Sequence, residues 1–281
     1  MTMPNFLYIG APRAGSTWIF EALRAHPQVF VPIAKYVKYY FDEQFHRGQA
    51  WYESHFDQAG PKHAAVGEVT TGYLYSESAL RRIADDIPNA KILVSVRNPV
   101  ERDWSAYLHM KRNANNAGSF AEEMNGQYRF ISEYGRYDHY LPKVFELFPR
   151  GNVNVMFYDD LKADPKAFLR SLYGFLGVDP MFDYAEVDRP KYVAREARSP
   201  AMAKITKDLA WAARRSGMPN LIGKVKKIPG LQKALYRSTS EKSTKMLGAD
   251  DRRRLQEKHR DGIKQLELML DRDLSHWLDN Q

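Results

Sequence analysis

A run of small residues near the start of the chain, set between a predicted strand and a predicted helix, most constrains the fold. The apolar run Phe6–Ile9 reads as a buried strand, Gly10–Thr17 as a loop, and the residues from there to Ala25 as a helix. Such a loop exposes backbone N–H groups, and the helix N-terminus adds partial positive charge. Two hydroxyl residues and Arg13 add further donors, so the loop is predicted to bind a phosphate group.

The loop resembles the Walker A loop of nucleotide hydrolases but departs from it at one position. That pattern places lysine after its second glycine, and here Ser16 stands there. The cation of the loop is instead Arg13, two residues before Gly15. The match to ATP and GTP hydrolases is therefore poor. A P-loop phosphotransferase stays an alternative, because Asp159-Asp160 after a later strand resembles a Walker B ending.

Further apolar runs alternate with helical patterns. Lys91–Arg97 and Asn152–Tyr158 read as buried strands, and Val100–Arg112 and Pro165–Leu176 as the helices that follow them. Strands that alternate with helices predict an α/β fold, with a central parallel β-sheet flanked by helices. The length allows one large core, so residues 1–281 are predicted to form a single domain.

A second set of side chains suited to binding phosphate begins at the end of the strand Lys91–Arg97. Arg97 is expected at the carboxyl end of that strand, and Ser105 lies early in the next helix. Ligands of open α/β sheets bind outside the carboxyl ends of the strands. Two such sites on neighbouring strands indicate a nucleotide that is phosphorylated at two positions.

Both motifs resemble those of sulfotransferases that use 3′-phosphoadenosine-5′-phosphosulfate (PAPS), and the likeness is closest to the glycan-type and bacterial members. The resemblance covers most of residues 5–180 and the last helix, and it implies PAPS as the sulfuryl donor. It also implies that Arg97 and Ser105 bind the 3′-phosphate. The residues that it assigns to the 5′-phosphosulfate are Arg13, Ala14, Gly15, Ser16, Thr17 and Trp18. Other family-like stretches are His26-Pro27, Gly67-Glu68-Val69-Thr70, Tyr158-Asp159-Asp160-Leu161, Phe175-Leu176-Gly177 and Asp271-Arg272-Asp273-Leu274-Ser275.

Sulfuryl transfer needs cations near the leaving group and a base for the acceptor proton. Arg13 is assigned electrostatic stabilisation, since a guanidinium hardly donates a proton. The resemblance implies a glutamate as general base, but Tyr36 stands at its place. Lys35 and Lys38 are candidates for contact with the sulfate or leaving-group charge, and solvent exposure is the alternative for both.

Three readings of the base stay open. The run from Lys35 to Asp42 reads as a half-buried strand with structural tyrosines. Glu68 is the best remaining carboxylate for the base, with a structural role near the phosphate loop as its alternative. The third reading is a protein that binds PAPS but reacts poorly.

Charge is concentrated in one region of the chain. The whole chain has a net charge of +8, and residues 200–245 contain eleven Lys and Arg against two acids. This region belongs to a mainly helical substrate-side segment at about 188–245, and Asp250–Trp277 is predicted as the terminal helix. The patch fits an anionic acceptor, peripheral contact with an anionic membrane, or a solvated helix face. No common nucleic-acid motif is present, so no nucleic-acid partner is predicted.

Composition excludes several other classes of site. The sequence has no cysteine, so thiolate catalysis and disulfides are excluded, and no histidine spacing indicates a metal site. There is no signal-like or membrane-spanning run, and a cytoplasmic location is predicted. The predicted acceptor is a hydroxyl, less often an amine, of a glycan, a glycolipid or a small natural product.

Overall fold

Five strands form the central sheet of the computed structural model, in the order β2-β3-β1-β4-β5, and every neighbouring pair runs parallel. The predicted α/β fold with a central parallel sheet is therefore confirmed. The loop that was predicted to bind phosphate follows the middle strand, β1, and the second motif follows its neighbour β4. The strands are β1 (Phe6–Gly10), β2 (Val29–Phe30), β3 (Ala65–Val69), β4 (Lys91–Val96) and β5 (Val153–Phe157).

Most of the basic region at about 188–245 lies outside the residues that the structure describes, so its predicted helical character stays a prediction. Two short strands of this region are described, β6 (Arg195–Ala197) and β7 (Tyr236–Ser238), and they pair antiparallel. The described residues are 3–33, 35, 37, 40–113, 118–125, 131, 133–187, 195–197, 236–238 and 247–279.

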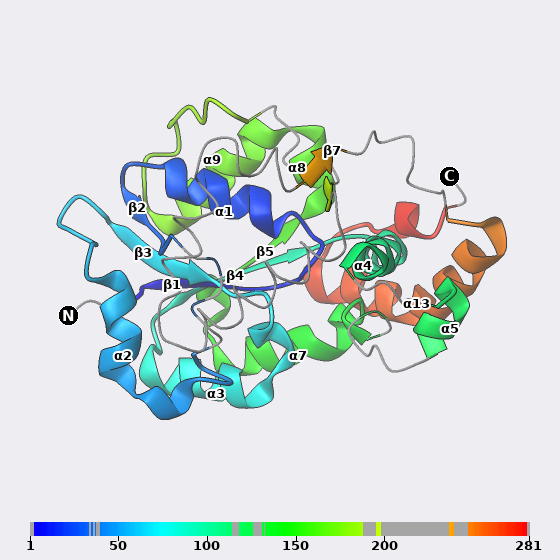
Figure 1. The fold of residues 1–281 in the computed structure, drawn as a ribbon, viewed down its shortest axis with the longest axis horizontal. Helices are drawn as coiled ribbons and strands as arrows, with labels where there is room; N and C mark the ends of the chain where they lie inside the picture. The colour runs from blue at the N-terminus through cyan, green and yellow to red at the C-terminus, as the bar shows by residue number, and fades with distance from the viewer. Residues whose placement is uncertain are drawn as a thin grey trace.

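Helices cover both faces of the sheet (Figure 1). Along β1, Leu7 and Ile9 point to one face and Phe6 and Tyr8 to the other, as the alternation of a strand requires. Figure 1 places α1, α8 and α9 over one face and α2, α3 and α7 over the other. These helices are α1 (Ser16–Ala25), α2 (Gln49–Glu53), α3 (Glu77–Asp86), α7 (Tyr137–Leu147), α8 (Tyr158–Ala163) and α9 (Pro165–Leu176).

The helix predicted over Pro165–Leu176 is confirmed at both ends. The Asp164 carboxylate accepts the backbone N–H groups of Lys166 at 3.0 Å and Ala167 at 2.9 Å, which caps the first turn. Gly177 ends the helix with a φ of 79°, a left-handed conformation that glycine adopts without a Cβ penalty.

The predicted terminal helix over Asp250–Trp277 is too long. Helix α13 (Ala249–Leu270) stops where Asp271 enters the left-handed region with a φ of 48°, and a 3₁₀ turn over Ser275–Trp277 follows. The chain turns back here because Trp277 packs into the core, where it is 2% exposed.

The strand reading of the run from Lys35 to Asp42 is also not met in its described residues. Val37, Tyr40 and Phe41 are buried but lie in turns and irregular backbone, and β2 ends earlier, at Phe30. The tyrosine and phenylalanine of this run pack among other rings, so their structural role is supported.

Strand β3 was not predicted from the sequence, because Gly67 and Glu68 interrupt its apolar pattern. All five of its residues are buried. A Cβ at Gly67 would lie 2.3 Å from the carbonyl oxygen of Phe6 on β1, so glycine permits the close approach of the two strands.

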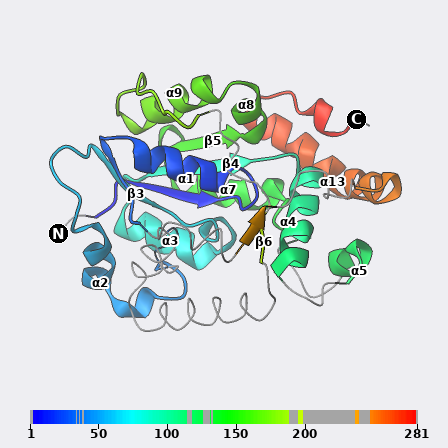
Figure 2. The ribbon, with the colours of Figure 1, turned by 45° about the horizontal axis from the view of Figure 1, so that its top comes forward.

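Three helices gather at one end of the molecule, α4 (Pro99–Asn113), α5 (Phe120–Asn125) and α13 (Figure 2). Pro99 takes the first position of α4, as the sequence predicted. Among the described residues, no helix combines the length and the apolar character that a membrane span requires.

Candidate active site

Two residues of the loop after β1 adopt a left-handed backbone conformation, which few residues other than glycine tolerate. Gly15 has a φ of 86° directly before α1, and Arg13 has a φ of 71°, which is uncommon for a residue with a Cβ. A Cβ at Gly15 would also lie 2.9 Å from the side chain of Leu161 and 3.2 Å from that of Tyr158. Both the conformation and the packing therefore require glycine at this position.

Ser95, a buried residue of β4, holds the loop in this shape. Its hydroxyl donates to the carbonyl oxygen of Ala14 at 2.6 Å, and its carbonyl oxygen accepts the N–H of Ala11 at 2.9 Å. Its hydroxyl also contacts the hydroxyl of Tyr8. The loop is thus preorganised by the neighbouring strand, which lowers the entropic cost of binding an anion there.

The two motifs predicted to bind phosphate meet in space. The Arg13 Nε donates to the Ser105 hydroxyl at 3.1 Å, across 92 residues of sequence. One guanidinium N–H of Arg97 donates to the carbonyl oxygen of Arg13 at 3.4 Å. The loop before α1 therefore lies in one cluster with the end of β4 and with Ser105 of α4.

Lys35 joins this cluster from the segment after β2. Its Nζ donates to the Ser16 hydroxyl at 2.9 Å and to the Thr17 hydroxyl at 3.2 Å. Burial, followed by the nearby Arg13 guanidinium, lowers the pKa of the Lys35 ammonium to about 7. A site that disfavours its own cation in this way favours the arrival of an anion.

Glu68 lies in β3 beneath a shell of donors and is 1% exposed. Its carboxylate accepts the hydroxyls of Tyr52 and Thr70, both at 2.6 Å, and that of Tyr73 at 3.4 Å. The backbone N–H of Val37 donates to it as well. Burial nevertheless raises the pKa of the Glu68 carboxyl to about 7, because desolvation outweighs these bonds.

This burial predicts a pH dependence of stability that Glu68→Gln removes. The native protein holds a proton on Glu68 that the unfolded chain releases near its ordinary pKa of 4.5, so this group's contribution to stability falls as the pH rises from there to about 7. Urea unfolding measured from pH 5 to pH 8 should show that the free energy of unfolding of Glu68→Gln rises relative to that of the wild type as the pH rises. The control is Glu257→Gln at an exposed position of α13. Parallel curves for wild type and Glu68→Gln would contradict the prediction.

The side chain of Trp18, which was also predicted for the site, lies in the core. The Trp18 indole is 8% exposed and packs edge-on against Phe168 and Tyr184 in the core, so its contribution to a ligand would come from its main chain in the first turn of α1. Lys38 lies outside the described residues, as does Tyr36 at the position of the family's glutamate.

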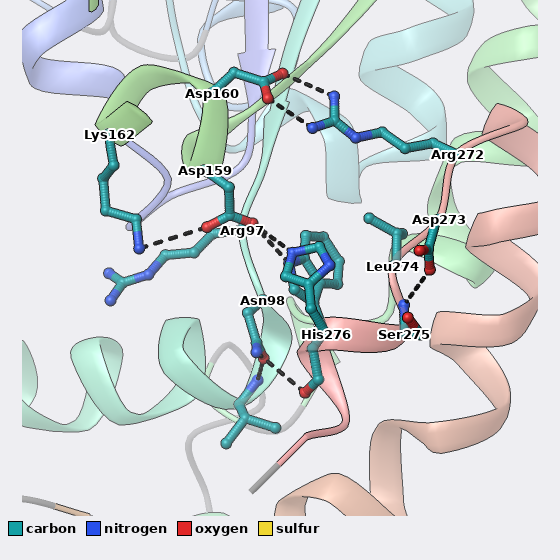
Figure 3. A network of polar contacts seen from close by, with 12 residues as sticks. Arg97, Asn98, Asp159, Asp160, Lys162, Arg272, Asp273, Leu274, Ser275 and His276 are labelled. Atoms are coloured by element: carbon teal, nitrogen blue, oxygen red, sulfur yellow. Dashed lines mark hydrogen bonds and ion pairs between the residues drawn. The ribbon is translucent and has the colours of Figure 1, made fainter. Parts of the chain in front are cut away.

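The C-terminal segment ties the ends of β4 and β5 together, which sequence reasoning missed (Figure 3). Arg272 forms a two-pronged ion pair with Asp160, at 2.6 and 2.7 Å, and the Trp277 indole N–H donates to Asp159 at 2.6 Å. The Asn98 side chain donates to the Trp277 carbonyl oxygen at 3.2 Å. These contacts brace the backbone beside Arg97.

Tyr158 is another site residue to which the sequence assigned no role. Its ring lies against Gly15 of the loop, and the Arg97 guanidinium lies 4.9 Å from the ring centroid. The ring therefore packs against both the loop and Arg97, beside the direct bond between Arg97 and the Arg13 carbonyl oxygen. A tyrosine directly after the apolar strand was the available signal, but only the fold shows what it touches.

Among the residues that the structure describes, no three histidine, aspartate or glutamate side chains gather closely enough to hold a metal ion.

Comparisons with known proteins point to one family. A family model described as Sulfotransferase domain matches residues 3–216. The bifunctional heparan sulfate N-deacetylase/N-sulfotransferase 3 of Homo sapiens is 28% identical over 205 residues, which is 66% of this chain and 23% of that protein. The heparan sulfate glucosamine 3-O-sulfotransferase 3B1 of Mus musculus is 27% identical over 233 residues, which is 80% of this chain and 56% of that protein.

Solved structures share the fold. A sulfotransferase from Alicyclobacillus acidocaldarius matches with a TM-score of 0.71 and 22% identity, over 99% of this chain and 100% of that one. Mouse sulfotransferase SULT7A1 complexed with PAP matches with a TM-score of 0.54 and 16% identity, over 93% of this chain and 84% of that one.

Proposed function

Because the chain belongs to the sulfotransferase domain family, we propose that it transfers a sulfuryl group from PAPS to a hydroxyl of an acceptor. The observation that carries this proposal is the bond of 3.1 Å between Arg13 and Ser105, which joins the loop for the 5′-phosphosulfate to the motif for the 3′-phosphate. A nucleotide with phosphates at both ends of its ribose fits such a joint site.

The acceptor is proposed from the relatives and from the charge of the chain. The chain spans 23% of one heparan sulfate relative and 56% of another, so it shares one part of each. Both of those proteins are named for heparan sulfate, which supports a glycan acceptor, with glycolipids and small natural products as further candidates. The positive excess in residues 200–245 supports an anionic acceptor or contact with a membrane surface.

Cationic side chains beside the first turn of α1 would act on the charge that develops during transfer. The acceptor oxygen forms a bond to sulfur and releases its proton to solvent, while the bond from sulfur to the 5′-phosphate oxygen breaks and negative charge grows on that phosphate. We assign Arg13 and Lys35 to this charge, with the hydroxyls of Ser16 and Thr17 orienting the Lys35 ammonium. Preorganised donors in a partly buried site stabilise such charge strongly.

We assign Glu68 a positioning role instead of the acceptance of the acceptor proton. Its carboxylate already accepts bonds from three hydroxyls and from the N–H of Val37, and the Tyr73 hydroxyl in turn accepts the N–H of Phe41. These bonds hold the segment that follows Lys35. The proposed function of Glu68 is therefore to fix where Lys35 lies.

The phosphotransferase alternative is weakened by the partners of Asp159 and Asp160. In a Walker B ending, an aspartate at this position would be open to a magnesium ion. Here Asp160 is bound by Arg272 and Asp159 by Trp277. The carboxylates serve to anchor the C-terminal segment, which fits the sulfotransferase proposal better.

The proposed activity is tested with PAPS labelled in its sulfuryl group. The expected result is transfer of the label to a polysaccharide with free hydroxyls, with one adenosine 3′,5′-bisphosphate formed per sulfate transferred. A polysaccharide with free amines and a phenol complete the acceptor panel. Absence of binding of adenosine 3′,5′-bisphosphate, together with thermal stabilisation by Mg-ATP, would overturn the proposal in favour of a phosphotransferase.

A further inference from the structure

Glu101 joins two arginines that are far apart in the sequence. Its carboxylate lies 3.5 Å from a guanidinium nitrogen of Arg97 and 3.2 Å from one of Arg252. All three side chains are partly open, with 21% of Arg97, 37% of Glu101 and 24% of Arg252 exposed. Arg252 thus lies beside the residue predicted to bind the 3′-phosphate, although it belongs to the first turn of α13 and to neither phosphate motif.

A buried network holds α13 against α4 and so determines where Arg252 lies. His259 pairs with the Asp103 carboxylate at 2.8 Å, and Arg102 pairs with the same carboxylate at 2.8 Å. These side chains are at most 3% exposed. Gly135 leaves room for the network, since a Cβ there would lie 3.0 Å from Asp103 and 3.1 Å from His259. Arg252 and His259 lie on the same helix, two turns apart. The pair between His259 and Asp103 therefore fixes the position of Arg252 relative to α4.

The charges of this group favour an added anion. The two guanidinium groups share one carboxylate in the part of the chain that the structure describes, which leaves an excess of positive charge between α4 and α13. Each guanidinium has five N–H donors, and Glu101 takes up only part of that capacity. Arginine binds phosphate through paired donors, so two of them beside one another suit a phosphate group better than a single carboxylate.

We propose that Arg252 is a second arginine ligand of the nucleotide's 3′-phosphate, and that Arg97 and Arg252 together select nucleotides that carry this phosphate. The inference rests on the proposed function, because it assumes that a nucleotide with a 3′-phosphate occupies the site. Glu101 holds both guanidinium groups in place before the nucleotide arrives. Helix α13 then contributes a ligand to the donor site, in addition to its packing against α4.

Isothermal titration of adenosine 3′,5′-bisphosphate and of 5′-AMP against wild type and Arg252→Ala tests this role. The expected result is a loss of roughly tenfold to a hundredfold in affinity for the bisphosphate, as for one charged hydrogen-bonded contact, with affinity for 5′-AMP unchanged. Arg252→Lys should recover part of the loss because it keeps the charge. The matched control is Arg253→Ala, the next residue of the helix, whose side chain is exposed.

The outcomes separate this inference from the proposed function. Equal loss for both nucleotides, or no loss for either, would overturn the role of Arg252 and leave it as a tie between two helices. A wild type that binds the bisphosphate no better than 5′-AMP would instead remove the 3′-phosphate site itself, and the proposed function with it. Unchanged 5′-AMP binding also shows that Arg252→Ala folds correctly.

Discussion

Arg97→Ala should lose roughly a hundredfold to ten-thousandfold in affinity for adenosine 3′,5′-bisphosphate. Arg97 lies at the centre of the cluster, with its guanidinium against Tyr158, near Glu101 and bonded to the Arg13 carbonyl oxygen. A bidentate contact with a phosphate comprises two charged hydrogen bonds of about 1.5 to 3 kcal/mol each, and every 1.4 kcal/mol or so is tenfold in affinity. Isothermal titration at fixed salt measures the change.

Two further variants show whether the loss belongs to the phosphate contact. Arg97→Lys keeps the charge but not the paired donors, so it should bind the bisphosphate with intermediate affinity. Arg81→Ala removes an arginine that is 53% exposed on α3 and pairs with Glu77, and it should bind like the wild type. Wild-type affinity in Arg97→Ala would contradict the assignment of the 3′-phosphate site.

Lys35→Met should lower the rate of transfer by roughly a hundredfold to a thousandfold, the usual cost of losing one preorganised donor to developing charge. Methionine keeps most of the length of the side chain and removes its charge. Because the hydroxyls of Ser16 and Thr17 already hold the Lys35 amine, the variant should change turnover more than it changes KM. Steady-state kinetics with saturating PAPS measure this difference.

The same lysine predicts that donor binding depends on pH. In the free protein the pKa of Lys35 is lowered to about 7, first by burial and then by Arg13, and an anion bound beside it raises that pKa again. Above pH 7 binding therefore takes up a proton, and affinity falls as the pH rises. At pH 8 the nucleotide's own phosphates are already ionised, so titration in two buffers of different ionisation enthalpy reports the uptake by Lys35.

Controls for Lys35 follow from its place in the fold. Lys35→Met should abolish the proton uptake, while Lys62→Met at an exposed position should retain it. Proton uptake that persists in Lys35→Met would assign the titration to another group. Unchanged turnover in Lys35→Met would show that Arg13 stabilises the charge on the leaving phosphate without Lys35.

The features that the sequence predicted well are local ones. The loop before α1 and the capped helix α9 depend on residues a few positions apart, so their glycines, proline and hydroxyls indicate them directly. Even the pairing of Arg13 with Ser105 follows from a general rule, because the carboxyl ends of parallel strands meet at one edge of the sheet.

The features that it did not predict depend on tertiary packing. In the sequence, Glu68 is a candidate base. In the structure, the hydroxyls of Tyr52 and Tyr73 donate to its carboxylate, which is buried. His259 and Asp103 are 156 residues apart, and nothing in either neighbourhood indicates that they meet. The early end of α13 has the same cause, since the burial of Trp277 outweighs the helical tendency of the preceding residues.

The contacts of the C-terminal segment with Asp159 and Asp160 form late in the synthesis of the protein. The phosphate loop is among the first segments to be synthesised, but Arg272 and Trp277, which anchor Asp160 and Asp159, are translated after every strand of the central sheet. During translation the nascent sheet can pair its strands while the ends of β4 and β5 still lack these anchors. On a ribosome, tight capture of the nucleotide should therefore begin only after residue 277 has left the exit tunnel.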